Sequence, residues 1–214
     1  MALEDVDTPA LLLDLDNFEF NIQLMADLVK KFKINHRPHA KTHKSPVVAQ
    51  KQIAAGAVGQ CCQKVAEAEI LVAGGINDIL VSNQIVGRRK LDRLAGLARN
   101  AKIRVCVDND DNINQINAAA RRFNATIEVL VEIDIGAGRC GVIPGKTAVD
   151  LAQSITKSSN LTFGGLQAYQ GRAQHIRGFG ERKIAIEKAG NLVQKTINLL
   201  SEADLDCRLV TGAG

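Results

Sequence analysis

Short apolar runs alternate with amphipathic stretches along most of the chain. The clear apolar runs are Ala10–Leu15, Ile79–Ser82, Ile103–Val107, Ile127–Ile133 and Leu161–Ala168; a last run begins near Arg208, and weaker runs end at Lys41 and Gln63. Their richness in Val, Ile and Leu is typical of strands that are buried on both faces. The intervening stretches have helical spacing, at Phe18–Phe32, Ser45–Ala55, Val65–Ala73, Arg88–Ala98, Ile113–Phe123, Thr147–Thr156 and Ile184–Ala203. The alternation predicts βαβ units and therefore an α/β fold with a parallel sheet.

Residues that commonly begin or end helices stand at several predicted boundaries. The expected N-terminal caps are Asp16, either Asp110 or Asp111, and Ser45, which is followed by Pro46. Gly74 and Gly75 stand where the third helix should end, as C-terminal glycines do. These residues support the helix assignments.

The number of strand–helix units favours a barrel over an open doubly wound sheet. After the first apolar run there are six strand–helix units and a further strand that runs to Gly214. Polar residues follow the strands at 41–43, 60–63, 83–84, 108–109, 134–139, 169–170 and 211–212. In a (β/α)8 TIM-type barrel these positions share one rim, which carries the active site. Because an eighth strand is missing, we expect residues 1–214 to form one incomplete barrel domain, truncated before the last strand.

Composition and charge exclude several other classes. Aromatic residues make up only 3%, and a net charge of +4 with interspersed acidic residues gives no basic stripe, so we expect no nucleic-acid partner. No apolar segment is long enough for a membrane span, and Met1–Thr8 lacks the core of a signal peptide. The number of cysteines, five, is odd, which disfavours a framework of disulfides, and their spacing is not that of a zinc site. We therefore expect reduced thiols. A cytoplasmic enzyme or binding protein is the expectation.

The densest cluster of basic side chains lies at residues 36–44. Lys41 stands at the end of a predicted strand, where neighbouring cations and partial burial would lower the pKa of a lysine, as Schiff-base chemistry requires. Phosphate binding by the cluster is a close alternative, and a solvated basic loop is another. A metal site at His39 and His43 is disfavoured, because Pro38 indicates an extended segment rather than a helix.

A second glycine-rich motif has the spacing of a dinucleotide-binding loop. Gly136, Gly138 and Gly141 form a GxGxxG pattern after a predicted strand. Pro144 and Gly145 follow at once, and no acidic residue ends a second strand at the distance needed to bind a ribose. The sequence therefore argues against a dinucleotide site.

Five segments match known sequence patterns in order along the chain: Asp7–Asp16, Arg37–Lys44, Ile133–Val142, Gly165–His175 and Val210–Gly214. The patterns are DTPxLLLDLD, RPHxKTHK, IDxGxxRxGV, GLQAYxGxxQH and the start of VTGGGTGT. In these segments the chain resembles D-threonine aldolases, 3-hydroxy-D-aspartate aldolases and D-serine dehydratases. No single motif is decisive, but five in register are specific. These enzymes bind pyridoxal 5′-phosphate (PLP) on a barrel of the alanine racemase type.

The resemblance implies roles for individual residues. Lys41 would hold PLP as a Schiff base, and Arg139 would lie beside the phenolic oxygen of the cofactor. The remaining implied cofactor-binding residues are His39, Gln60, Tyr169, Thr211, Gly212 and Gly214, of which the last three would begin the phosphate cradle. From the residues alone, Arg139 would be a surface cation and Tyr169 a packing residue.

The activity implied by the resemblance is that of a PLP-dependent lyase. It would cleave a β-hydroxy D-amino acid, such as D-threonine or 3-hydroxy-D-aspartate, to glycine and an aldehyde. D-serine dehydration is the alternative; racemisation and non-catalytic PLP binding are less favoured, and a phosphate- or nucleic-acid-binding module least of all.

The resemblance also implies features beyond residue 214. Relatives hold a divalent metal (Mg, Mn or Zn) in a C-terminal β-domain, which is absent from residues 1–214, so no metal ligand is assigned. Ala10–Leu15 is expected to pack with that domain. A homodimer is expected for the full-length protein.

Overall fold

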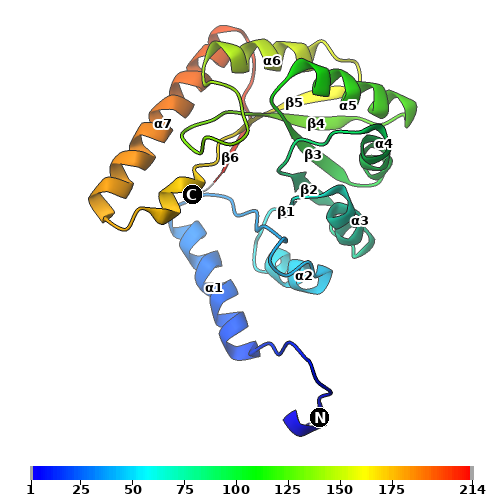
Figure 1. Ribbon diagram of the computed structural model, residues 1–214, viewed down its shortest axis with the longest axis vertical. Helices are drawn as coiled ribbons and strands as arrows, with labels where there is room; N and C mark the ends of the chain where they lie inside the picture. Colours follow the sequence, from blue (N-terminus) through cyan, green and yellow to red (C-terminus); the bar gives the residue numbers. More distant parts are fainter. Residues whose placement is uncertain (1, 213–214) are drawn as a thin grey trace.

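The computed structural model describes residues 2–212, which form a parallel six-stranded sheet with helices between the strands (Figure 1). The strands, in sheet order, are β1 (Gln60–Cys62), β2 (Asp78–Val81), β3 (Lys102–Val107), β4 (Ile127–Glu132), β5 (Leu161–Gln167) and β6 (Leu209–Thr211). The α-helices are α1 (Leu15–Lys31), α2 (Pro46–Ala54), α3 (Val65–Ala73), α4 (Arg88–Leu97), α5 (Asp110–Arg122), α6 (Lys146–Thr156) and α7 (Phe179–Glu202), and two short 3-10 helices are η1 (Leu3–Asp5) and η2 (Gly171–His175). The α/β prediction is confirmed.

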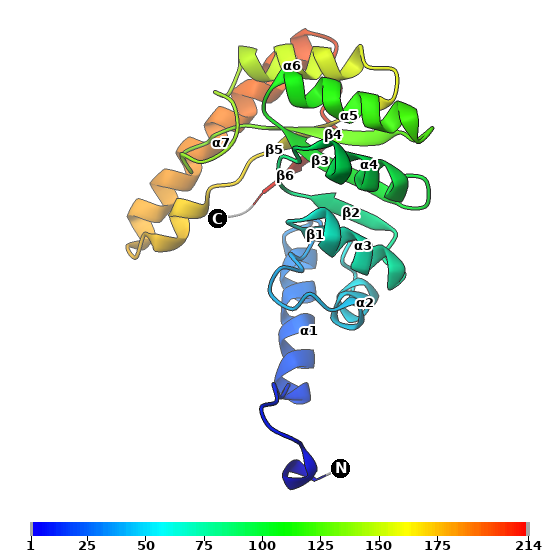
Figure 2. The ribbon, with the colours of Figure 1, turned by 45° about the vertical axis from the view of Figure 1, so that its right-hand side comes forward.

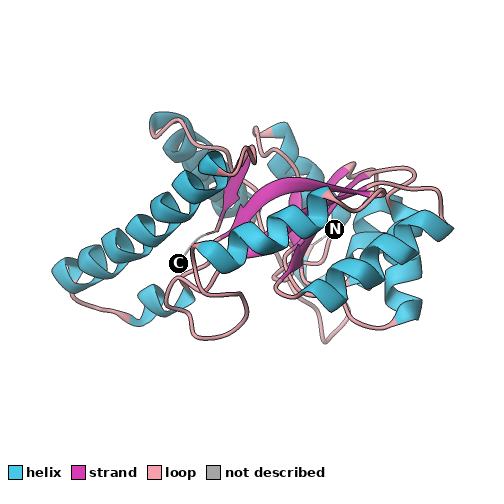
Figure 3. Cartoon of the chain, turned by 90° about the horizontal axis from the view of Figure 1, so that it is seen from above, coloured by secondary structure: helices cyan, strands magenta, loops and turns pink. Residues whose placement is uncertain are grey.

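The sheet is curled, and its helices lie outside the curve. In Figures 1 and 2, α2 to α6 follow an arc around the strands, and Figure 3 shows the same sheet from above. Each strand pairs in parallel with the next one along the sequence, so β1 and β6 are the two edges of a half-barrel. The predicted strand that ends at Lys41 is reduced to a single bridge between His39 and Cys61. Pro38, which has no N–H to donate, limits pairing there.

The alternation of side chains along the strands gives the sheet two separate apolar faces. Outward-facing residues such as Val105 and Val129 join the large core between the sheet and the helices. The inner face holds a smaller cluster of buried residues from four strands, Cys61, Leu80, Cys106 and Leu130, against which Leu209 packs. Because side chains alternate with a period of two, residues two positions before or after these along each strand also face the inside of the curve.

The ends of the helices confirm two of the expected caps and correct two. Ser45 caps α2 by accepting a hydrogen bond from the Val48 amide at 3.4 Å, and α3 ends at Gly74. The cap of α1 is Asp14 rather than Asp16, because α1 begins at Leu15 and Asp14 accepts from the Asn17 amide. Asn109, one residue before the expected Asp110 or Asp111, caps α5.

The N-terminal segment differs from the pattern of a buried strand. Residues 10–14 form no strand, Leu11 to Leu13 are exposed, and α1 has no buried residue.

All five cysteines are free thiols, and three of them are buried. Over residues 2–212, no helix combines the length and apolar character that a membrane crossing needs.

Candidate functional site

A cavity of about 350 Å³ opens on the inside of the curved sheet, near the carboxyl ends of the strands. Six of the predicted site residues line it, and they come from four different parts of the chain: His39, Lys41, Arg139, Tyr169, Thr211 and Gly212. Gly214 lies outside the described residues. The structure therefore brings together side chains that are more than 170 positions apart in sequence.

Lys41 reaches the cavity because its segment alternates in the same way as a strand. Arg37, His39 and Lys41 all line the cavity, whereas Pro38 and Ala40 are buried. Backbone hydrogen bonds join this segment to β1: the Cys61 amide donates to Pro38 O and the Ala40 amide to Cys61 O, both at 2.7 Å. Lys41 is exposed rather than partly buried, which corrects that part of the expectation.

Gln60 does not belong with the other predicted site residues. It is fully buried, and its Nε2 donates to Gln52 Oε1 of α2 at 2.9 Å, on the helix side of the sheet. The alternation along β1 explains the difference, because Cys61 and Gln63 line the cavity while Gln60 and Cys62 do not. The structure thus places Gln63 rather than Gln60 at the cavity, which does not fit the predicted contact of Gln60 with a cofactor.

Arg139 lies on a loop whose glycine amides donate hydrogen bonds to two aspartates. Asp134 Oδ1 accepts from the amides of Gly136 at 2.9 Å and Gly138 at 3.0 Å, and these bonds lower the pKa of Asp134. The Gly141 amide donates to Asp108 Oδ2 at 3.2 Å. All three glycine amides of the GxGxxG pattern are thus already used, so they are not free to bind a pyrophosphate.

Arg139 and Tyr169 lie together in the cavity. The guanidinium carbon of Arg139 is 5.1 Å from the ring centroid of Tyr169, and Gln174 Nε2 donates to Tyr169 Oη at 3.2 Å. A Cβ on Gly171 would lie 2.6 Å from the tyrosine ring, so only glycine leaves room for this ring position. These contacts fix the phenol in one orientation.

A buried carboxylate stands behind Arg139. Glu132 is 4% exposed, accepts from Gln84 Nε2 at 2.7 Å, and has Oε1 at 3.9 Å from Arg139 Nη2. Burial raises the pKa of Glu132, and the bond from Gln84 and the charge of Arg139 oppose that effect. Glu132 therefore lies behind the cavity, close to Arg139, without lining it.

Below the cavity, a chain of charges crosses the inner face of the sheet. Asp78 Oδ1 lies 2.6 Å from Arg37 Nη1 and 2.5 Å from Arg104 Nη1. Arg104 Nε lies 3.0 Å from Glu128 Oε1. These residues alternate with the inner apolar cluster along their strands, and the ion pairs make it possible to bury Arg104 at 6% exposure.

The far side of the cavity is formed where β5 and β6 approach closely. The Ala168 amide donates to Thr211 O at 2.7 Å. A Cβ on Gly212 would lie 1.7 Å from Ala168 O, so this close approach requires glycine. Thr211 and Gly212 are thereby placed opposite the Lys41 segment, across the cavity.

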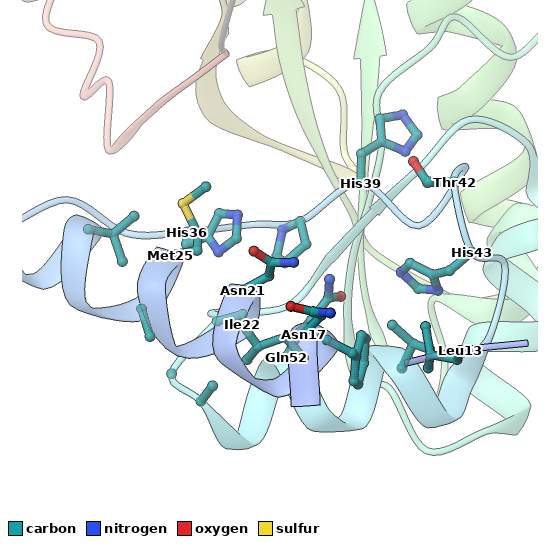
Figure 4. Close-up of a pocket in the computed structure, with 18 of the residues that line it drawn as sticks. Leu13, Asn17, Asn21, Ile22, Met25, His36, His39, Thr42, His43 and Gln52 are labelled. Atoms are coloured by element: carbon teal, nitrogen blue, oxygen red, sulfur yellow. The ribbon is translucent and has the colours of Figure 1, made fainter. Parts of the chain in front are cut away.

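A larger and more apolar groove of about 650 Å³ lies on the other side of the Lys41 segment (Figure 4). It is lined by α1, α2 and residues 36–43, and His39 borders both this groove and the cavity. In Figure 4 the ring of His39 points away from α1. No group of three or more His, Cys, Asp or Glu side chains within residues 2–212 is arranged to hold a metal ion.

The charge of the cavity indicates the kind of ligand it can take. Arg37, Lys41 and Arg139 line it, and none of its described lining residues is a carboxylate. The uncharged polar lining residues that the sequence did not single out as ligands are Gln63, Ser82, Asn83, Gln167 and Gln174. Gln63 and Asn83 belong to the predicted clusters of polar residues after strands, whereas Ser82 and Gln167 end apolar runs and gave no such signal. A lysine amine beside such a surface suits an anionic ligand that carries a carbonyl group.

The curved parallel sheet and its cationic cavity define a half-barrel α/β protein with a small-molecule site at the carboxyl ends of its strands. The chain belongs to the family described as alanine racemase, N-terminal domain, which matches residues 13–214.

Two curated relatives and one solved structure are similar over nearly the whole chain. A D-threonine aldolase from Arthrobacter sp. is 46% identical over 212 residues, which are 99% of this chain and 56% of the relative. A 3-hydroxy-D-aspartate aldolase from Paracoccus denitrificans (strain Pd 1222) is 43% identical over 216 residues, 100% of this chain and 56% of the relative. The crystal structure of D-threonine aldolase from Filomicrobium marinum has a TM-score of 0.96 at 51% identity, covering 99% of this chain and 57% of that one. The chain thus spans about half the length of the relatives it matches.

Proposed function

We propose that this chain is the PLP-binding part of a lyase that cleaves β-hydroxy D-amino acids to glycine and an aldehyde. The observation that carries the proposal is the meeting of Lys41 with Arg139 and Tyr169 in a cavity that has cationic but no acidic lining residues in the described chain. The similarity to a D-threonine aldolase and a 3-hydroxy-D-aspartate aldolase supports the substrate class.

The donor set of the cavity fits PLP. Lys41 supplies the amine that would hold the aldehyde of the cofactor covalently, and the cavity volume lies in the usual range for small-molecule sites. Thr211 and Gly212 would receive the phosphate. His39 borders the cavity beside Lys41, and Gly214 remains an expected contributor from the sequence.

When bound, PLP supplies an electron sink for the negative charge that remains on the amino acid after a bond to Cα breaks. Arg139 would stabilise the ionised phenolic oxygen of the cofactor through its guanidinium. Tyr169, held by Gln174 and flanked by Arg139, would contact the cofactor with an oriented hydroxyl. Asp134 and Asp108 hold the loop that carries Arg139, and Glu132 lies near its guanidinium, so these three residues position the arginine.

We further propose that the half-barrel is the first part of a (β/α)8 barrel in a longer protein with a C-terminal β-domain. The partial coverage of the relatives supports this. So do the two ends of the sheet: within residues 2–212, β1 is joined on its outer side only to the Lys41 segment, and β6 is the last strand. A divalent metal held outside residues 1–214, a homodimer and a cytoplasmic location belong to the same proposal.

Incubating the full-length protein with D-threonine, 3-hydroxy-D-aspartate, D-serine and D-alanine tests the reaction class. We expect glycine with acetaldehyde or glyoxylate from the first two substrates. Release of ammonia and a keto acid instead would establish a dehydratase, and L-alanine from D-alanine would establish a racemase.

A further inference from the structure

Three hydrogen bonds in a row join the backbone amide of Lys41 to the backbone carbonyl of Cys62 in β1, through His39 and through Ser82, which directly follows β2. The Lys41 amide donates to His39 Nδ1 at 3.2 Å. His39 Nε2 lies 3.4 Å from Ser82 Oγ, and Ser82 Oγ donates to Cys62 O at 3.4 Å. The Ser82 amide donates to the same carbonyl at 3.0 Å, which fixes the position of the serine.

The chain has one consistent direction of donation. Because Nδ1 of His39 accepts from the Lys41 amide, the proton of the neutral ring must be on Nε2. That N–H can then donate to Ser82 Oγ, whose own proton goes to Cys62 O. Burial, and then the charge of Lys41, lower the pKa of His39, and both effects favour the neutral ring that this chain requires.

The Lys41 segment depends on such side-chain contacts because its backbone is joined to the sheet on one side only. Within residues 2–212 it pairs with β1 through a single bridge. Two side chains extend past β1 to β2: Arg37 to Asp78, and His39 to Ser82. Asp78 and Ser82 are four residues apart, so their side chains lie on the same face of the sheet. They therefore contact the Lys41 segment at two points along its length.

We propose that Ser82 is a positioning residue for Lys41. It holds His39 as the Nε2–H tautomer, and His39 holds the Lys41 amide, so that the lysine side chain enters the cavity from a fixed backbone. The inference rests on the proposed role of Lys41 as the PLP-binding residue. It adds a residue, Ser82, and a defined ring tautomer to that role.

The tautomer can be measured directly by ¹⁵N NMR of the histidine rings in the full-length protein. Residues 1–214 contain four histidines, and His39→Asn identifies the signal of His39 by its loss. In the wild-type protein without PLP, Nε2 should carry the proton and Nδ1 should accept a hydrogen bond. A predominant Nδ1–H tautomer would overturn the inference without any variant of Ser82.

Substitution of Ser82 tests the consequence for Lys41. In Ser82→Ala the ring of His39 loses its partner at Nε2 and is free to turn away from the Lys41 amide, so its signal should show mixed tautomers. The dissociation constant for PLP should rise roughly two- to tenfold, as expected for the loss of one hydrogen bond. Ser82→Thr, which keeps the hydroxyl, should restore both. The matched control is Ser158→Ala. Ser158 Oγ also donates to a backbone carbonyl, Ser154 O at 3.0 Å, but Ser158 does not line the cavity.

Each outcome decides between the two proposals. A changed tautomer with wild-type PLP affinity would show that His39 does not position Lys41, and weaker affinity with an unchanged tautomer would show that Ser82 acts by another route. Either result overturns the inference. If the wild-type protein forms no borohydride-reducible adduct with PLP at all, the proposed function fails instead, whatever the tautomer of His39.

Discussion

Arg139 lies over the ring of Tyr169, with its guanidinium carbon 5.1 Å from the ring centroid, although the two residues follow different strands. The Asp134 loop after β4 positions the arginine, and Gly171 and Gln174 after β5 position the tyrosine. A guanidinium over an aromatic ring is favourable by about 1 kcal/mol. Neighbouring strands of a parallel sheet thus bring a cation and a phenol to the same side of the cavity.

This pairing predicts the effect of removing Arg139. Arg139→Ala should raise the dissociation constant for PLP roughly tenfold or more, because a charge-assisted hydrogen bond is lost. Arg139→Lys should recover part of the affinity, since it keeps the charge but not the planar fork. Absorbance titration with PLP measures this, and Arg121→Ala on the exposed face of α5 is the control. Wild-type affinity in Arg139→Ala would remove this residue from the site.

Glu132 should make stability depend on pH. Its pKa is raised above the ordinary 4.5, mainly by burial, so the folded state binds this proton more tightly than the unfolded chain does. Its stabilising contribution is therefore present below about pH 4.5 and is lost as pH rises through the native pKa. Glu132→Gln removes this dependence, and its stability relative to wild type should increase from about pH 4 to pH 7.

Urea denaturation at several pH values measures this difference. Glu202→Gln, at an exposed position near the end of α7, is the control and should show no comparable trend. A constant difference in the free energy of unfolding between Glu132→Gln and wild type would contradict the prediction.

The charge chain below the cavity should be costly to break at its centre. Arg104→Met leaves Glu128 without its inner partner and should lower the free energy of unfolding by about 3 kcal/mol. The double variant Arg104→Met/Glu128→Gln should recover a large part of that loss, because the half-buried carboxylate that Arg104 paired with is then uncharged. Chemical denaturation of all three proteins tests this. A double variant less stable than Arg104→Met would show that the charges themselves stabilise the sheet.

Gly165 should tolerate no side chain. Its φ is +135°, and a Cβ there would lie 1.9 Å from Leu209 O, on the strand that carries Thr211. Gly165→Ala should therefore destabilise the protein by about 2 kcal/mol or more and weaken PLP binding. Gly190→Ala in α7 is the matched control, since a Cβ there meets nothing within 4 Å. It should stabilise the protein by about 0.5–1 kcal/mol. Equal effects of the two changes on thermal unfolding would refute the account of Gly165.

The sequence predicted the elements well where the periodicity was strong. β3, β4 and β5 and the helices between them lie where their apolar patterns placed them, because those strands are buried on both faces. The weak run that ends at Lys41 gave only one bridge, and Ala10–Leu15 gave no strand. Within the described chain, each segment lacks a neighbouring strand on one or both sides. A local pattern of apolar residues cannot indicate this, because strand pairing depends on distant parts of the chain.

The principal residues of the site could be predicted from the sequence, but the side of the sheet that each strand residue faces could not. The resemblance placed Lys41, Arg139 and Tyr169 correctly in one cavity. Gln60 was misplaced, because a polar residue at a strand end can face either side of the sheet, and the phase of β1 follows only from its pairing with β2. Ser82 was seen only as the end of an apolar run, since its role depends on a contact with His39, 43 residues away in sequence.

Lys41 is the residue that we expect to bind PLP covalently. Reduction of the full-length, PLP-loaded protein with borohydride, followed by peptide mass spectrometry, locates the modified lysine. We expect the pyridoxyl group on Lys41 and no reducible adduct in Lys41→Ala, while Lys51→Ala on the exposed face of α2 remains labelled. Labelling of Lys44 or another lysine in place of Lys41 would contradict the claim.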